Sequence, residues 1–274
     1  MLEQDEFFED SPRVIYRHSP LLSVICQVRF PTILRIESQV PSEFQDAIRS
    51  MFPIFERTQM SGIPDDLPPE VARMIGIAAQ QPVSYRFQTE DRLCTVSLEP
   101  GSLSLTSTNY RRWEEFTRFL NPPLEALIDT YKPSFFSRIG LRYQNAIVPT
   151  EIGLADVPWA DIISSNILGE LRQQRFGRGE IREAHRLLRI VSDETKEGIF
   201  LQHGLGKVGP AQSNAYIIDI DCYSDQKAEV HDALPHLNRF NYRARRAFRW
   251  CVSDQLHSAL GPEGTSDVDI GGGE

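Results

Sequence analysis

No stretch of the sequence approaches the roughly 18 consecutive apolar residues that a membrane-spanning helix needs. Residues 1–6 also lack the basic region and the apolar run of a secretory signal peptide. Cysteine is scarce, with only four residues in 274, and no two of them form a CxxC pair. Each lies within an apolar stretch, which favours buried thiols in a reducing compartment over a disulfide framework. These absences predict a cytoplasmic protein with no membrane partner, whose buried thiols are Cys26, Cys94, Cys222 and Cys251.

Sequence signatures of cofactor and metal chemistry are equally scarce. The six histidines include no HExxH pattern, and no GxSxG nucleophile motif is present. Residues 204–209 match GxGxxG, but a dinucleotide site needs a helix immediately afterwards, and here a second strand pattern follows. We therefore expect a glycine-rich hairpin loop at this position, and we expect no cofactor and no bound metal.

The net negative charge of the sequence comes from the two ends of the chain. The sequence has 29 Lys and Arg against 38 Asp and Glu, for a net charge of −9. Residues 1–10 hold five acids and residues 261–274 hold four, with no Lys or Arg in either segment, so residues 11–260 are neutral overall. This composition predicts a flexible acidic N-terminus over residues 1–17 and a disordered acidic tail over residues 261–274. Such ends are able to fold back over basic ridges of the body.

Hydrophobic periodicity predicts an α+β fold. Apolar patterning predicts strands at residues 21–30, 83–88, 93–98, 103–106, 134–148, 185–192, 198–203 and 215–223, with a clear period of two at residues 21–30 and mixed periodicity at residues 134–148. Helical spacing marks helices at residues 42–55, 111–131, 161–174 and 232–260, and Pro122-Pro123 is expected to kink or split the second of these. We expect two antiparallel-sheet halves, residues 18–150 and 151–260, each with a long helix packed across its sheet.

Three sequence blocks carry a resemblance to a known family. They are residues 19–31 (SPLLSVICQVRFP), residues 138–145 (RIGLRYQN) and the pattern Asn238-x-x-Asn241…Phe248-x-x-x-Val252-Ser253-Asp254-x-Leu256. In order and spacing these blocks resemble a sporadically distributed, uncharacterised bacterial protein family of about this length. The resemblance implies a bacterial cytoplasmic accessory protein, in a defence or toxin–antitoxin context. It transfers no active-site residue.

Two aspartates alternate with apolar residues on one predicted strand. Asp219 and Asp221 project from the same face, roughly 6.6 Å apart from the rise per residue. A shared divalent metal ion would suit such a pair in a metal-dependent hydrolase or nuclease. The alternative is that both aspartates lie on the solvated face of an amphipathic strand.

Arginine is the most informative residue type in this sequence. One cluster falls within residues 172–189 and includes Arg175, Arg178 and Arg182. On the last predicted helix, Arg239, Arg243 and Arg246 are i, i+4 and i+7 neighbours and therefore form a ridge, with Arg249 nearby. Aromatic residues are interleaved with this ridge, as in sites that hold single-stranded nucleic acid. The alternative is that these arginines pair with neighbouring acids or with an acidic partner.

The preferred prediction is a non-enzymatic interaction protein that binds a macromolecular partner, namely a protein encoded nearby. The alternative is a nucleic-acid-binding protein that uses the two arginine clusters. A metal-dependent hydrolase or nuclease that uses Asp219 and Asp221 is a second alternative. The sequence leaves a homo-oligomer open.

Overall fold

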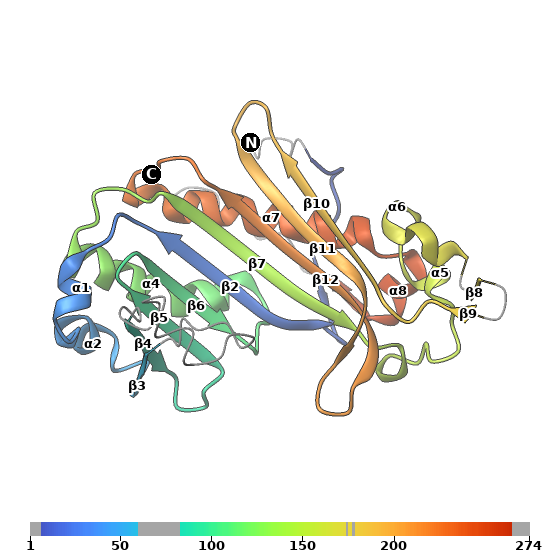
Figure 1. Ribbon diagram of the computed structural model, residues 1–274, viewed down its shortest axis with the longest axis horizontal. Helices are drawn as coiled ribbons and strands as arrows, with labels where there is room; N and C mark the ends of the chain where they lie inside the picture. The colour runs from blue at the N-terminus through green and yellow to red at the C-terminus, as the bar shows by residue number, and fades with distance from the viewer. Residues whose placement is uncertain (1–6, 60–82, 174, 177–178, 265–274) are drawn as a thin grey trace, which may run out of the picture. The chain divides into compact units, whose positions relative to one another are not determined.

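The computed structural model describes residues 7–59, 83–173, 175–176 and 179–264 (Figure 1). Its chain divides into two compact units. The first unit comprises Met1–Val24, Leu141–Ser224 and Leu237–Glu274, and the second comprises Ile25–Gly140 and Asp225–His236. Each unit therefore takes segments from both sides of residue 150. Within the ranges described, no helix is long and apolar enough to cross a membrane.

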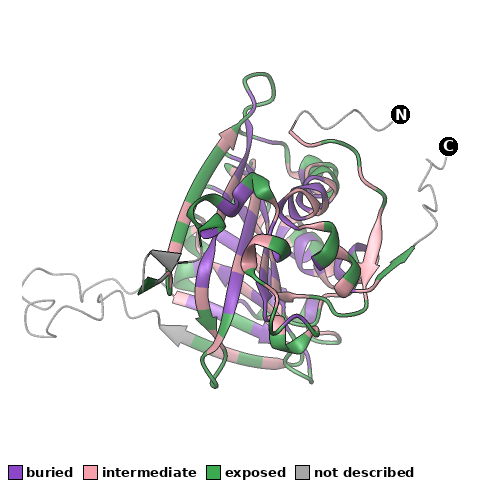
Figure 2. Cartoon of the chain, turned by 90° about the vertical axis from the view of Figure 1, so that its right-hand side faces the viewer, coloured by how far each residue is buried: buried purple, intermediate pink, exposed green. Residues whose placement is uncertain are grey.

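The first unit is built on antiparallel strands in the order β10, β11, β12, β7. Their bounds are Ala184–Val191 for β10, Glu197–Val208 for β11, Ser213–Ser224 for β12 and Arg138–Ile147 for β7, of which residues 141–147 belong to this unit. Helix α7 (Ala233–Cys251) packs on one face, where the Tyr143 hydroxyl donates to the Asn241 amide oxygen at 2.9 Å. Alternate residues of β12 are fully buried on the α7 side, and Figure 2 shows buried residues concentrated along the strands.

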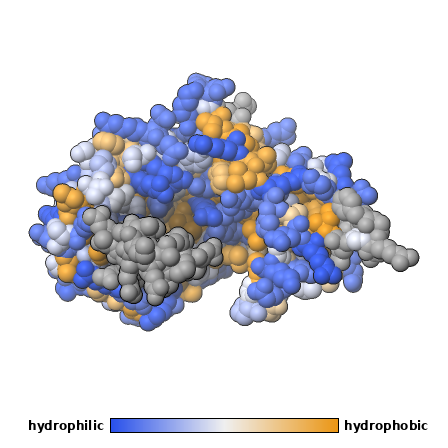
Figure 3. Space-filling view, in the orientation of Figure 1, coloured by the Kyte–Doolittle hydropathy of each residue, from blue (hydrophilic) through white to orange (hydrophobic). Residues whose placement is uncertain are grey.

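The edge strand β10 exposes apolar side chains. Leu187, Leu188 and Val191 all lie on this strand and are exposed, and Figure 3 shows hydrophobic residues gathered on the surface over β10 and β11.

The glycine-rich segment differs from its prediction, because residues 204–208 continue β11 and only the residues from Gly209 to Gln212 form the turn. Gly204 has a φ of +152°, and a Cβ there would lie 1.7 Å from the Ala184 carbonyl oxygen on β10. The glycine therefore lets two strands approach closely inside the sheet.

The two helices that were predicted near this sheet are shorter than expected. The range 161–174 holds three short segments in place of one helix, and these are α5 (Trp159–Ile162), α6 (Ser165–Leu168) and η3 (Gly169–Arg172). The last helix ends at Cys251, and α8 (Asp254–Ala259) begins after a break. Ser253 caps α8 by accepting a hydrogen bond from the Leu256 N–H at 3.1 Å, which makes a separate helix start. The prediction of one helix over residues 232–260 is therefore wrong.

Both chain ends contribute ordered strands to the first unit. β1 (Val14–Tyr16) pairs antiparallel with β13 (Pro262–Gly264). This pairing corrects the predicted boundaries, because residues 14–16 were expected in a flexible segment and residues 262–264 in a disordered one. The rest of the predicted tail, residues 265–274, lies outside the described residues, as do residues 1–6. A second short pair joins β8 (Arg175–Phe176) to β9 (Gly179–Glu180), and η2 (Pro149–Glu151) follows β7.

The second unit contains the predicted meander. Strands β3 (Ile54–Gln59), β4 (Val83–Gln88), β5 (Cys94–Glu99) and β6 (Ser102–Ser107) pair antiparallel with their neighbours in chain order, and β2 (Leu21–Arg29) lies beside β6. The remaining elements are α1 (Leu34–Ser38), α2 (Ser42–Ile48), α4 (Trp113–Tyr131) and η4 (Val230–Asp232). The Phe44 ring of α2 packs on Phe87 of β4 and on Tyr131 of α4. An aromatic core therefore joins the helices to the sheet, and the predicted α+β class is confirmed.

Helix α4 is continuous through Pro122 and Pro123, so these prolines do not split it. Each proline removes one helical donor at a cost of about 3 kcal/mol in an isolated helix. Burial of the apolar stripe that includes Leu120, Leu124 and Leu127 offsets this cost, since tertiary packing supplies most helical stability.

Candidate functional site

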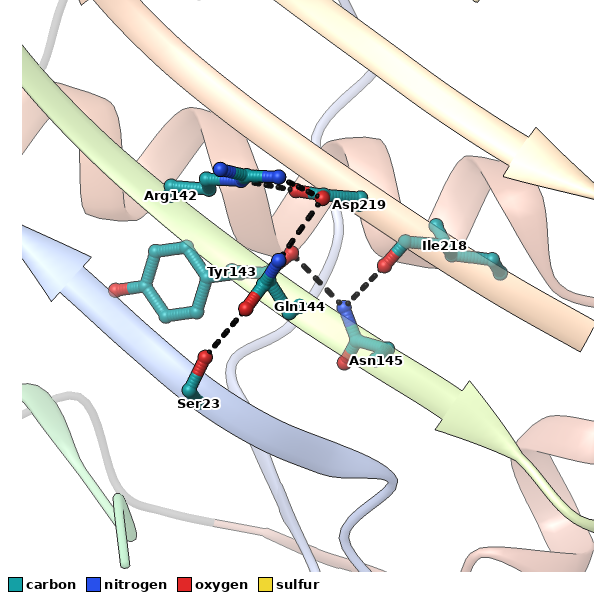
Figure 4. A network of polar contacts seen from close by, with 7 residues as sticks. All are labelled: Ser23, Arg142, Tyr143, Gln144, Asn145, Ile218 and Asp219. Carbon is teal, nitrogen blue, oxygen red and sulfur yellow. Dashed lines mark hydrogen bonds and ion pairs between the residues drawn. The ribbon is translucent and has the colours of Figure 1, made fainter. Parts of the chain in front are cut away.

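The two aspartates of the predicted pair on β12, Asp219 and Asp221, have different surroundings. Asp219 is only 7% exposed, and its two oxygens accept three hydrogen bonds (Figure 4). Arg142 of β7 donates two of them, one from Nε at 2.8 Å, and Gln144 donates the third from Nε2 at 3.1 Å. Gln144 in turn accepts a hydrogen bond from the Ser23 hydroxyl at 2.7 Å. Asp219 is therefore one end of a polar network that crosses three strands.

This network bears on both interpretations of the two aspartates, a shared metal ion and a solvent-exposed strand face. Asp219 itself is buried, because the part-exposed Arg142 and Gln144 cover it, whereas Asp221 on the same face of the strand is half-buried. A metal ion would reach the Asp219 oxygens only by displacing Arg142 and Gln144. Among the described residues no group of three or more His, Cys, Asp and Glu side chains is placed to hold a metal ion. The Asp219 carboxylate raises the pKa of Arg142, as expected for a guanidinium hydrogen-bonded to a carboxylate.

The four cysteines and His203 lie in buried, structural positions. All four cysteines are buried, as predicted, and burial raises the pKa of Cys26 to about 12, which keeps it a thiol. His203 of β11 is buried and shares a hydrogen bond of 2.8 Å with the Tyr216 hydroxyl. Burial and the nearby Arg186 lower the pKa of His203 to about 4, so the ring is neutral near pH 7.

The arginine cluster at residues 172–189 does not form one surface. Arg178 and the Arg175 side chain lie outside the described residues, and Arg182 is exposed ahead of β10. Arg186 and Arg189 are three residues apart on a strand and therefore point to opposite faces. Arg186 pairs with Glu170, whereas Arg189 donates to the Tyr223 hydroxyl at 2.7 Å. Helical spacing groups arginines on one side, but strand spacing separates them.

On α7 the predicted ridge exists, and its arginines bind acids. Glu197, the first residue of β11, is only 3% exposed and forms ion pairs with Arg239 at 2.8 Å and with Arg243 at 3.0 Å. Arg249 pairs with Asp254, just past the helix end. The interpretation that these arginines pair with acids is confirmed. Two of them, Arg243 and Arg246, are buried rather than exposed as a binding ridge would require.

The fourth arginine is covered by the chain's own N-terminal segment, residues 7–10. Arg246 forms an ion pair with Asp10 and donates a hydrogen bond of 3.3 Å to the Phe8 carbonyl oxygen. The Tyr242 hydroxyl donates to the same Asp10 carboxylate at 3.1 Å. The hydrogen bonds that Arg246 and Tyr242 donate to the Asp10 carboxylate lower the pKa of Asp10, so it is charged near neutral pH.

Aromatic contacts complete this arrangement. The Arg243 guanidinium lies 4.5 Å from the centre of the Phe7 ring, and the Arg246 guanidinium lies 4.0 Å from the centre of the Tyr242 ring. The ring centres of Phe8 and Trp250 are 5.6 Å apart. We call Tyr242, Arg243, Arg246 and Trp250 the α7 arginine site. It holds residues 7–10 through one cation–π contact, one ion pair and one aromatic pair, together with the hydrogen bonds from Arg246 and Tyr242.

The sequence alone does not reveal three participants, Glu197, Phe7 and Phe8. Glu197 lies 42 residues from its partner Arg239 along the chain, so no local pattern joins the two. Phe7 and Phe8 lie within the acidic N-terminal segment, although adjacent aromatic residues are unusual in a solubilising tail. The aromatic pair next to Glu9 and Asp10 was the available signal.

No protein-family model matches the chain, and a comparison with curated proteins finds no significant match.

Proposed function

We propose that this chain is a non-enzymatic interaction protein that binds a protein partner through the α7 arginine site. One observation carries the proposal, namely that the site already engages a peptide segment, residues 7–10, through side-chain contacts. Arginine, tyrosine and tryptophan are also the residue types that contribute most to binding energy at protein interfaces.

Charge balance favours an acidic peptide over a nucleic acid. Outside the N-terminal segment, Arg239 and Arg243 pair with Glu197 and Arg249 pairs with Asp254, so three of the four arginines already contact acids of the body. A nucleic acid would have to compete with these acids for most of its phosphate contacts. Two phosphate contacts on a single strand would give a slope of only about −1.4 in the logarithm of affinity against the logarithm of salt concentration. Nucleic-acid binding by this site alone would therefore be weak at physiological salt.

The test uses proteins encoded beside this one as candidate partners. Each is co-expressed with the full chain, and the affinity of any complex is measured for the wild type, for Arg246→Ala and for Arg118→Ala. Arg118 is an exposed arginine on α4 and serves as the matched control. Circular dichroism confirms that both variants are folded. We expect Arg246→Ala to weaken the complex at least about tenfold, because an arginine that anchors an interface contributes about 2 kcal/mol or more.

Two results would count against the proposal. Equal affinities of the wild type and Arg246→Ala for a partner would show that the partner binds elsewhere on the chain. Binding of single-stranded DNA or RNA with a salt slope much steeper than −1.4 would favour the nucleic-acid alternative, with a longer basic track than the α7 arginine site provides.

A further inference from the structure

The N-terminal stretch from Phe7 to Tyr16, which we call the strap, is held differently at its two ends. At its inner end, β1 pairs with β13, and the register places Val14 opposite Gly264 and Tyr16 opposite Pro262. The Tyr16 hydroxyl lies 2.7 Å from His257 Nδ1, and the Tyr16 ring packs edge-on against Phe248. Backbone pairing and a half-buried aromatic ring therefore anchor the inner end.

The outer end of the strap, residues 7–10, is held by side chains. The Asp10 side chain stays 78% exposed, whereas that of its partner Arg246 is 5% exposed. Phe7 and Phe8 are half-buried, and the Phe8 carbonyl oxygen is the backbone atom shown to accept a hydrogen bond from the site. The exposed outer end therefore covers the buried arginine in a way that another peptide can displace. A carboxylate of that peptide can replace Asp10 on Arg246, and its rings can replace those of Phe7 and Phe8.

We infer that residues 7–10 are a built-in competitor for the partner, and that the α7 arginine site takes an acidic peptide in which aromatic residues adjoin the acids. This inference rests on the proposed function and adds to it the class of ligand and the means of regulation. Phe7 and Phe8 supply rings for Arg243 and Trp250, and Asp10 supplies the carboxylate for Arg246 and Tyr242. A partner segment with the same order of groups makes the same contacts.

The tether sets how strongly the strap competes. Only residues 11–13 separate the docked end from β1, and short linkers give effective concentrations in the millimolar range. Suppose that residues 7–10, as a free peptide, bind the site with a dissociation constant of about 0.1 mM. At an effective concentration of about 1 mM, the tethered strap would then occupy the site about ten times more often than it leaves it empty. Releasing the strap should then strengthen binding of an external peptide about tenfold.

The experiment uses a fluorescent synthetic peptide with the sequence of residues 7–13 as its probe. Fluorescence anisotropy gives the dissociation constant for the full-length wild type, for the double variant Phe7→Ala/Asp10→Asn and for Glu9→Gln. Glu9 is exposed, so its replacement removes one negative charge from the strap as a matched control. NMR chemical shifts of residues 7–10 confirm that the double variant has released its outer end.

We expect the double variant to bind the probe about tenfold more tightly than the wild type, and Glu9→Gln to stay within about twofold. Adding Arg246→Ala to the double variant should abolish this gain. Equal affinities of the wild type and the double variant would overturn the competition and leave the proposed function standing. If no variant binds the probe while an encoded partner still requires Arg246, the ligand class is wrong and the proposed function stands. If single-stranded nucleic acid binds the released site and the probe does not, the peptide class is overturned in favour of nucleic acid.

Discussion

His203 makes the stability of the fold depend on pH. Its ring is buried against Tyr216, and its pKa in the folded protein is about 4, against about 6.5 in an unfolded chain. The folded protein binds a proton on His203 less readily than the unfolded chain does. Above pH 6.5 the ring is neutral in both states, so His203 protonation does not lower the unfolding free energy there. Stability is lost as the pH falls from 6.5 towards 4, where the unfolded chain takes up the proton first. Between pH 7.5 and pH 5 the full shift corresponds to a loss of about 2 kcal/mol, and partial screening by solvent reduces it to about 1–2 kcal/mol.

Urea denaturation at pH 7.5 and pH 5 measures this loss in the wild type and in His203→Gln. Glutamine keeps a hydrogen-bonding group for the Tyr216 hydroxyl but does not titrate, so the variant should lose about 1–2 kcal/mol less than the wild type over this range. His185→Gln replaces an exposed histidine on the same sheet and should behave as the wild type does. If the wild type and His203→Gln lose the same stability, His203 is not the buried neutral group described above.

Three further substitutions test the packing directly. Gly204→Ala places a methyl group 1.7 Å from the Ala184 carbonyl oxygen. Thermal denaturation should therefore show that the unfolding free energy falls by about 3 kcal/mol or more, or that the chain does not fold. A fall of less than about 1 kcal/mol would contradict the close approach. Lys132 ends α4 with a φ of +49°, so Lys132→Gly should raise the unfolding free energy by about 0.5–1 kcal/mol in urea, and a loss would refute the left-handed cap. Glu197→Gln removes the buried carboxylate that pairs with Arg239 and Arg243 and should lower the unfolding free energy by about 3 kcal/mol, whereas an unchanged midpoint would show that these pairs contribute little.

Most of the strands could be predicted from the sequence because their apolar residues alternate cleanly. The meander of β4, β5 and β6 shows this, since each strand is half-buried and separated from the next by a polar turn. Helix ends were harder to predict. Apolar spacing continues past Cys251 into α8, so periodicity alone joins two helices that the Ser253 cap separates. At residues 204–208 the glycines resemble a loop, although the closeness of Ala184 requires a glycine within a strand.

The candidate site could be predicted only on its helical side. The spacing of Arg239, Arg243 and Arg246 follows directly from 3.6 residues per turn. Their partners could not be read in the same way, because Glu197 reaches Arg239 across 42 residues and Asp10 reaches Arg246 across 236. Such pairs depend on how the sheet and the strap bring distant segments together, and no local pattern encodes that arrangement.

NMR spectroscopy of the full-length wild type, with and without a saturating amount of unlabelled peptide of residues 7–13, tests the central claim most directly. The account predicts that bound peptide moves the backbone resonances of residues 7–10 towards random-coil positions, while those of Val14, Ile15 and Tyr16 in β1 stay unchanged. Saturation by the peptide with unchanged resonances at residues 7–10 would show that the peptide and the strap occupy different places, and would contradict the account.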